Sequence, residues 1–193
     1  MKTKKIILSV LSFFALVVLV ACGSGGNQEN TKSDSEEVST KTTTIEKKDS
    51  EKSQEIGYFQ SLVPGIDTQI TFYYEASTDM VLKQETHTQA SYKALGVTTI
   101  DEAKEALAPI FSQYEGIDGI THTVDYGDEY IIENLVLDYE NLDINDASKL
   151  PGFLSDGNNN ATYVSYTKSA DLLKESGFEE VKDGKFKDFQ PLD

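Results

Sequence analysis

Hydrophobic and polar residues divide the chain into three parts. Residues 6–21 form an uncharged apolar run behind a short lysine-rich start. Residues 22–55 are almost wholly polar or glycine, and such a segment buries too little apolar surface to offset the entropy lost on ordering. From residue 56 onward, aromatic and β-branched residues return. The pattern therefore predicts a disordered tether over 22–55 and one folded domain over 56–193.

The folded part begins with a predicted hairpin and helix. Apolar and polar residues alternate on both sides of a break at residues 77–79, which predicts a hairpin over 68–89. Residues 99–116 then carry apolar side chains at helical spacing. Thr99 and Glu102 have the spacing of a capping box, so we expect this helix to begin at Thr99.

A second hairpin is predicted over residues 117–139, with a two-residue turn at Gly127 and Asp128. A turn of that length fixes which residues lie opposite one another. It pairs Ile120 with Leu135, His122 with Glu133, and Val124 with Ile131. One face of this hairpin is then mostly apolar.

The last part of the domain reads as a strand over 161–166 followed by a helix that ends near residue 178. Gly177 with the apolar pair Leu173 and Phe178 predicts a Schellman motif at the end of this helix. Two hairpins interleaved with two helices favour an α+β fold. We expect an antiparallel sheet built from the two hairpins, with the two main helices packed on one face.

The junction between the first two parts contains the single cysteine of the chain. Leu19-Val20-Ala21-Cys22 matches a lipobox, and residues 1–21 have the layout of a lipoprotein signal peptide. Cys22 is then the attachment point for a diacylglyceryl group and palmitate, which hold the protein on the extracytoplasmic face of the cell membrane. The alternative is an inert cysteine in an ordinary signal or anchor.

The negative charge of the predicted domain limits the kinds of molecule that it can bind. The predicted domain has nine lysines, no arginine and 25 acidic residues. A phosphate backbone is repelled by such a field, so nucleic acid is not expected as a partner. The motifs of phosphate, dinucleotide and zinc-protease sites are missing, and we expect no cofactor.

The run over residues 92–143 and the segment "SADLLKESGF" at 169–178 resemble the YehR-like lipoprotein family, a domain whose function is not established. The matching motifs are a Leu-Gly-Val entry to the first helix, a Tyr-x-Gly-Ile-x-Gly-Ile-Thr-His link into the second hairpin, and a terminal Lys-Glu-Ser-Gly-Phe. The resemblance spans about residues 72–178. It implies a lipoprotein with an α+β domain and carries over no catalytic residue.

Two histidines supply the main candidate chemistry. His87 and His122 each lie between threonines on a predicted strand, and with Glu133 they form a candidate metal site for a surface enzyme or a metal-binding protein. The competing interpretation is that His122 simply pairs with Glu133 across the hairpin. Two weaker patterns are a calcium-loop-like "DGNNN" at 156–160 and an S-x-x-K spelling at Ser165.

The chain also has ten tyrosines, and most of them lie on or beside predicted strands. Sheet packing explains such a distribution, and a tyrosine-lined groove for a peptide or sugar is the functional alternative. The sequence therefore favours a lipid-anchored surface protein that acts as a non-enzymatic binding or accessory module. Its ligand, whether protein, peptide or sugar, is not specified by any motif.

Overall fold

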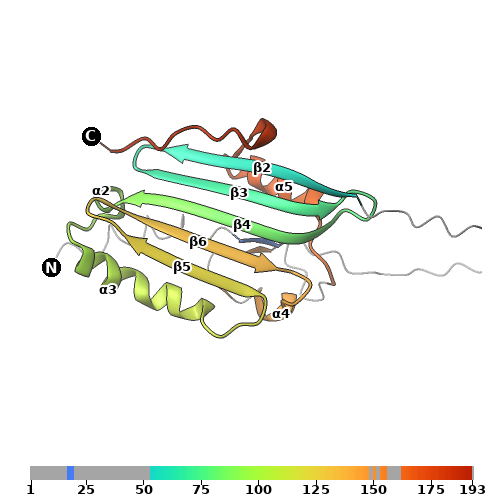
Figure 1. Ribbon diagram of the computed structural model, residues 1–193, viewed down its shortest axis with the longest axis horizontal. Helices are drawn as coiled ribbons and strands as arrows, with labels where there is room; N and C mark the ends of the chain where they lie inside the picture. The colour runs from blue at the N-terminus through green and yellow to red at the C-terminus, as the bar shows by residue number, and fades with distance from the viewer. Residues whose placement is uncertain (1–16, 20–52, 148–149, 151–152, 156–161, 193) are drawn as a thin grey trace, which may run out of the picture.

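Figure 1 shows the protein as a computed structural model, which describes residues 17–19, 53–147, 150, 153–155 and 162–192. Its main feature is a six-stranded antiparallel sheet in the order β5-β6-β4-β3-β2-β8. The strands are β2 (Gln54–Val63), β3 (Ile66–Glu75), β4 (Met80–Ser91), β5 (Ile120–Tyr126), β6 (Tyr130–Asp138) and β8 (Glu179–Glu180). A separate parallel pair joins β1 (Val17–Leu19) to β7 (Phe153–Ser155).

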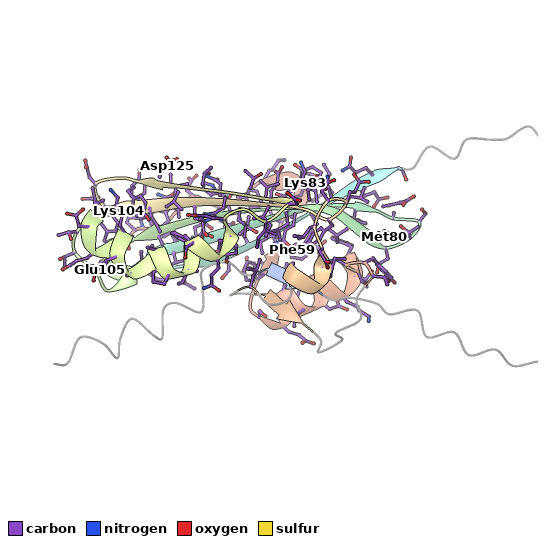
Figure 2. The ribbon with its side chains drawn as sticks, turned by 90° about the horizontal axis from the view of Figure 1, so that it is seen from below. Phe59, Met80, Lys83, Lys104, Glu105 and Asp125 are labelled. Carbon is purple, nitrogen blue, oxygen red and sulfur yellow. The ribbon has the colours of Figure 1, made fainter. Side chains whose placement is uncertain are left out.

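The helices lie on one face of this sheet, as Figure 2 shows for α3 and α5. They are α2 (Tyr92–Leu95), α3 (Ile100–Phe111), α4 (Ile144–Ala147) and α5 (Tyr166–Glu175), with 3₁₀ turns at Ser112–Tyr114 and Lys182–Gly184. The predicted α+β fold is thereby confirmed. We call the side of the sheet that packs on the helices the core face and the other side the open face.

The core lies between the core face and the helices. Phe59, Ile70, Phe72, Ile131, Leu135 and Leu137 come from the strands, and Leu107 and Leu173 from α3 and α5; all are at most 2% exposed. Burial of such side chains contributes about 1.5–3 kcal/mol each relative to exposure, so this layer is the main source of stability.

Strand β2 was not predicted, although it forms a full ladder with β3. Phe59 lies opposite Ile70, but Gly57 lies opposite Phe72, so a glycine stands where the pattern needs an apolar side chain. The reason is the ring of Tyr166, which occupies the space that a Gly57 side chain would fill. The strand begins at Gln54, two residues before the predicted boundary at 56.

The caps of the two long helices follow the sequence closely. Thr99 Oγ1 accepts a hydrogen bond from Glu102 N at 3.2 Å, while the Glu102 carboxylate reaches back to Thr98 N at 2.8 Å rather than to Thr99. At the end of α5, Phe178 N bonds Leu173 O at 2.9 Å and Gly177 N bonds Lys174 O at 3.1 Å. These two bonds are the predicted Schellman motif.

The strand predicted over 161–166 is wrong within the described residues 162–166. Only the bridge residues Val164 and Ser165 occur there, with Ser165 opposite Met80, and α5 already begins at Tyr166. Asp79 accounts for the difference, because its carboxylate accepts hydrogen bonds from Ser165 Oγ and from Thr167 N. The chain is thus held as a helix start instead of continuing as a strand.

The second hairpin differs from its predicted register by two residues. Ile120 lies opposite Leu137, His122 opposite Leu135, and Val124 opposite Glu133. Gly127 N bonds Tyr130 O at 2.9 Å, so the turn residues are Asp128 and Glu129, one position later than the predicted pair. Tyr92 holds the turn in this position, since its N–H donates to Glu129 O at 3.0 Å and its hydroxyl to Gly127 O at 2.6 Å.

Candidate functional site

The structure does not bring the three predicted metal ligands together. His87 lies on the open face, where its Nδ1 is 2.8 Å from Asn134 Oδ1. His122 and Glu133 lie on the core face, with His122 Nε2 2.9 Å from Glu133 Oε1. The sheet itself separates the two histidines, so one metal ion cannot bind both. Among the described residues, no group of three or more His, Cys, Asp and Glu side chains is arranged to hold a metal.

The predicted contact between His122 and Glu133 is confirmed, although it forms diagonally because the register is shifted. Glu133 is 2% exposed, and the His122 ring lies 4.7 Å from the Phe111 ring and 5.0 Å from the Tyr114 ring. Burial, helped by the Glu133 carboxylate, raises the pKa of Tyr114 well above its usual range. The pair is enclosed in the core and has the character of a structural contact.

One side of this buried pair is incompletely satisfied. Glu133 Oε2 and Thr88 Oγ1 have no hydrogen-bond partner among the described residues, and the two residues lie directly opposite each other on β6 and β4. A buried polar atom without a partner costs free energy. The single contact from His122 therefore carries most of the compensation for the buried carboxylate.

Other predicted features have structural roles or lie elsewhere. Ser165, first in the S-x-x-K spelling, is the N-cap of α5 and is 1% exposed, so its hydroxyl is not an available nucleophile. The segment 156–160 and Cys22 lie outside the described residues. Tyr74 stacks on Tyr166 with ring centroids 3.6 Å apart, and the Tyr139 hydroxyl donates to Gln84 Oε1 at 3.0 Å. Sheet packing thus accounts for several of the tyrosines.

A hollow of about 430 Å³ at one end of the sheet offers an accessible site, which we call the end pocket. Three segments form its walls: the start of α2 with the chain after it, the β5–β6 loop, and the C-terminal tail. The lining residues are Ser91, Tyr92, Lys93, Val97, Thr98, Asp128, Glu129, Tyr130, Phe189, Pro191 and Leu192.

Gly65 joins two of these walls. Its carbonyl accepts from Ser91 N, and its N–H donates to Gln190 O, both at 2.8 Å. Gly65 has φ of +84°, and a Cβ there would lie 2.8 Å from the Ala94 Cβ. Only glycine adopts this backbone conformation in so little space, so the turn between β2 and β3 sets the position of α2 relative to the tail.

The tail is fixed a second time by the buried side chain of Gln60. Gln60 Nε2 donates to Lys187 O at 2.9 Å, and Gln60 Oε1 accepts from Lys187 N at 2.9 Å. Asp67 orients this amide by accepting from Nε2 at 2.8 Å. The pocket wall formed by residues 189–192 is therefore supported by the sheet itself.

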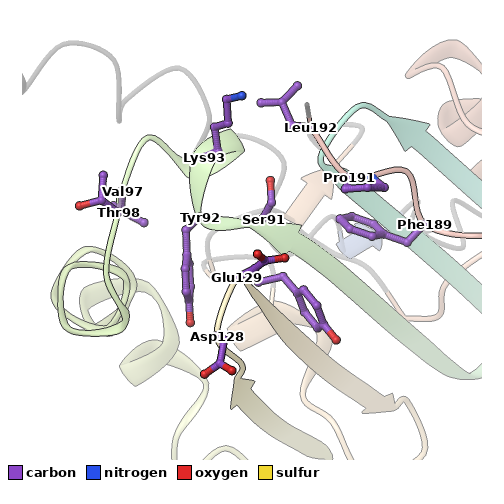
Figure 3. A pocket seen from close by; sticks show the side chains of 11 residues that line it. Ser91, Tyr92, Lys93, Val97, Thr98, Asp128, Glu129, Phe189, Pro191 and Leu192 are labelled. Carbon is purple, nitrogen blue, oxygen red and sulfur yellow. The ribbon is translucent and has the colours of Figure 1, made fainter.

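Three charged side chains line the end pocket, those of Lys93, Asp128 and Glu129. Figure 3 shows the Glu129 carboxylate in the middle of the pocket, between the Tyr92 ring and the side chains of Phe189 and Pro191. No hydrogen bond or ion pair to this carboxylate is made by the described residues. Burial raises the pKa of Tyr92, and the nearby Asp128 carboxylate raises it further.

The comparisons place the chain among known proteins. A family model described as a protein of unknown function, DUF1307, matches residues 55–179. The chain belongs to the DUF1307 family. The match contains the α2 and β5–β6 walls of the end pocket, while the tail residues 189–192 lie beyond it.

DUF1307 relatives confirm the predicted resemblance. The uncharacterized lipoprotein Lmo0207 of Listeria monocytogenes is 33% identical over 117 residues, covering 61% of this chain and 74% of its own length. The uncharacterized lipoprotein YehR of Escherichia coli K12 is 28% identical over 124 residues, covering 64% and 80%. The NMR structure of E. coli YehR aligns with a TM-score of 0.59 at 26% identity, over 69% of this chain and 94% of that one. This DUF1307 chain is thus a lipoprotein relative of unknown function. Its described residues include no helix with the length and apolarity needed to span a membrane.

The end pocket escaped the sequence analysis because its residues share no motif. Tyr92, Glu129 and Phe189 come from a helix start, a hairpin loop and a chain end. The one local signal was the tight turn in the second hairpin, which places acidic residues next to a tyrosine.

Proposed function

We propose that this protein is a lipid-anchored binding module that holds a cationic group of a peptide in the end pocket. The observation that carries the proposal is the Glu129 carboxylate, which lies unpaired between aromatic and apolar walls. A carboxylate beside aromatic faces is a favourable environment for an ammonium or guanidinium group, because charge attraction and cation–π contact act together.

The balance of charge supports a cationic ligand. The pocket is lined by the carboxylates of Asp128 and Glu129 and by one ammonium, that of Lys93. The predicted domain around it is strongly acidic. A field of this sign raises the local concentration of cations and repels anions. A lysine or arginine side chain next to an apolar residue satisfies both the charge and the apolar walls.

Binding accounts for the pocket better than catalysis. The lining includes no histidine or cysteine, and its Ser91 hydroxyl accepts a hydrogen bond from Ala94 N at 3.2 Å as the cap of α2. The alternative of a metal-dependent enzyme loses its ligand set, because His87 and His122 lie on opposite faces. Anchorage through Cys22 is part of the proposal and is supported by the lipobox and by the lipoprotein relatives.

A titration with short peptides tests the pocket. The probe is a leucine-lysine-leucine peptide with blocked ends, and the controls replace its lysine by norleucine or glutamate. We expect binding of the lysine peptide alone, with amide shifts in a ¹⁵N spectrum of the full chain at Tyr92, Glu129 and Tyr130. In Glu129→Gln the affinity should fall about tenfold, the effect of losing one charge-assisted contact of about 1.4 kcal/mol.

The matched control is Glu115→Gln, an exposed carboxylate beyond the other end of α3. It removes the same charge from the chain but not from the pocket, so binding should be unchanged. Equal losses in the two variants would mean that only the overall field attracts the peptide. Equal binding of the lysine and norleucine peptides would rule out cation recognition.

A further inference from the structure

The two edges of the main sheet differ in how far other segments of the chain cover them. At the β2 edge, Val181 N donates to Tyr58 O at 2.8 Å, β8 adds two residues of ladder, and Gln60 binds the tail. At the other edge, β5 pairs with β6 alone among the described residues. A bare edge is a template for pairing with another chain.

The ladder shows which backbone groups of β5 face outward. Gly127 N bonds Tyr130 O at 2.9 Å, and Asp138 N bonds Gly119 O at 2.8 Å, so the odd-numbered residues between them face β6. In an antiparallel pair the hydrogen-bonding direction alternates along the strand. The N–H and C=O groups of His122 and Val124 therefore point away from the sheet. No other described residue bonds them.

Strand β5 also lacks the usual protection of an edge. Its sequence "ITHTVDY" has no lysine, proline or glycine, and its pairing with β6 is regular over all seven residues. Natural edge strands are commonly shortened, bulged or given lysines to prevent unwanted pairing. Threonine, valine and isoleucine favour the extended conformation. The edge is thus already shaped for a further strand.

Helix α3 and the charges around it indicate what kind of strand fits. In Figure 1, α3 runs alongside β5 and extends beyond its outer edge. Figure 2 looks onto this edge, with Asp125 on the sheet and Lys104 and Glu105 on the helix side. The exposed acidic residues on α3, on the link from α3 to β5 and on β5 itself are Asp101, Glu102, Glu105, Glu115, Asp118 and Asp125. Lys104 lies over the Tyr126 ring at 5.3 Å.

We propose that the β5 edge binds an extended basic segment of a partner protein, which adds a seventh strand to the sheet. Backbone bonds to His122 and Val124 supply the affinity, and the acidic rim selects lysine- or arginine-rich partners. A second copy of this chain fits less well, because its predicted domain carries the same strong negative charge. This surface is distinct from the end pocket and does not depend on it.

The test uses a peptide that alternates lysine and valine, titrated into the ¹⁵N-labelled full chain. We expect slower hydrogen exchange at the His122 and Val124 amides and shifts along β5. The control peptide has the same side chains but N-methylated backbone amides on one edge, so it keeps the charge and loses the donors. Its affinity should be lower by a factor of about ten or more. The reason is that it loses hydrogen bonds worth about 1.4 kcal/mol together.

Two variants complete the experiment. Val124→Pro removes one outward N–H, and proline is tolerated where the N–H of an edge strand faces solvent, so binding should fall while circular dichroism is unchanged. Asp125→Asn should weaken binding and flatten its salt dependence. Equal binding of the two peptides, protection confined to other strands, or self-association of the chain through β5 would each overturn the proposal.

Discussion

Asp79 and Thr167 lie 88 residues apart in the sequence, yet Asp79 Oδ1 accepts from Thr167 N at 2.9 Å and from Thr167 Oγ1 at 2.7 Å. The other oxygen of the same carboxylate accepts from Ser165 Oγ. The turn between β3 and β4 thereby caps α5 from a distance and fixes the helix to the sheet. Asp79 has φ of +59°, a conformation that aspartate tolerates better than most residues.

Replacing Asp79 by asparagine should destabilise the fold by about 1–2 kcal/mol, because the bonds to Ser165 and Thr167 lose their charge. Asparagine also tolerates a positive φ, so backbone strain would not contribute to this loss of stability. Urea denaturation followed by circular dichroism measures the change. Asp183→Asn is the matched control: Asp183 has φ of +56° and is exposed, and its variant should stay within about 0.5 kcal/mol of the parent.

The same carboxylate predicts a pH effect. Burial by itself would raise the pKa of Asp79, but the hydrogen bonds from Ser165 and Thr167 outweigh it and hold the pKa below its usual range. The folded state then binds the proton less readily than the unfolded state. Its stabilising contribution is complete above about pH 4 and is lost as the pH falls further. The stability difference between the parent and Asp79→Asn should shrink below that pH; a constant difference would contradict the assignment.

Gly57→Ala should destabilise the sheet by about 1–3 kcal/mol, because the added methyl meets a ring that has no room to move. A Cβ at residue 57 would lie 2.5 Å from Tyr166 Cε2. Tyr166 is held by its stack on Tyr74 and by edge contacts with Phe72. In the Tyr166→Ala background the same Gly57→Ala change should cost little. Additive losses in the double variant would show that the ring is not the obstacle.

His122→Ala should cost about 3–5 kcal/mol, since it leaves the buried Glu133 carboxylate without its partner. Adding Glu133→Gln should recover part of the loss by removing the charge. His87→Ala provides the control, because His87 is only half-buried on the open face and its variant should lose far less. Thermal and urea unfolding measure all four proteins. Similar losses for the two histidines would contradict the difference in their environments.

Excess zinc and EDTA should give nearly the same melting temperature. A tight site would stabilise the protein by about 2.7 kcal/mol at a hundredfold excess over its Kd, which a melting experiment detects easily. The sheet between His87 and His122 prevents them from sharing an ion. A large zinc-specific rise that disappears in His87→Ala or His122→Ala would restore the metal-dependent hypothesis.

Cys22→Ser should abolish lipid attachment, because the hydroxyl does not replace the thiol as the acceptor of the diacylglyceryl group. Labelling with radioactive palmitate measures this directly, and the parent chain is the positive control. Label that still enters the variant would contradict anchorage at Cys22.

Local signals in the sequence predicted local structure well. The Thr99 cap and the Schellman motif at Gly177 depend on residues within a few positions of one another, and both are present. The contact between His122 and Glu133 was also predicted, even though the register was not. A shift of two residues keeps every side chain on the same face, so the two side chains still meet diagonally.

Features that depend on distant residues could not be predicted. The register of β5 and β6 is set by Tyr92, and the helix start at Ser165 by Asp79. Gly57 interrupts the apolar pattern by which β2 could be recognised in the sequence. The apolar group that fills the space beside Gly57 is the ring of Tyr166, which belongs to α5. The faces of His87 and Glu133 follow from the pairing of β4 with β6, which brings together strands far apart in the sequence.

The direction of β2 separates the end pocket from the point where the chain enters the sheet. The strand enters the sheet at Gln54 and ends at Val63, beside the turn that supports the end pocket. Ten residues of strand span about 33 Å at 3.3 Å per residue. The end of the sheet where the chain enters and the end that holds the pocket are thus opposite. In a chain attached through Cys22, the segment that leads to the lipid would not cover the pocket, which would stay open whichever way the tether lets the domain turn.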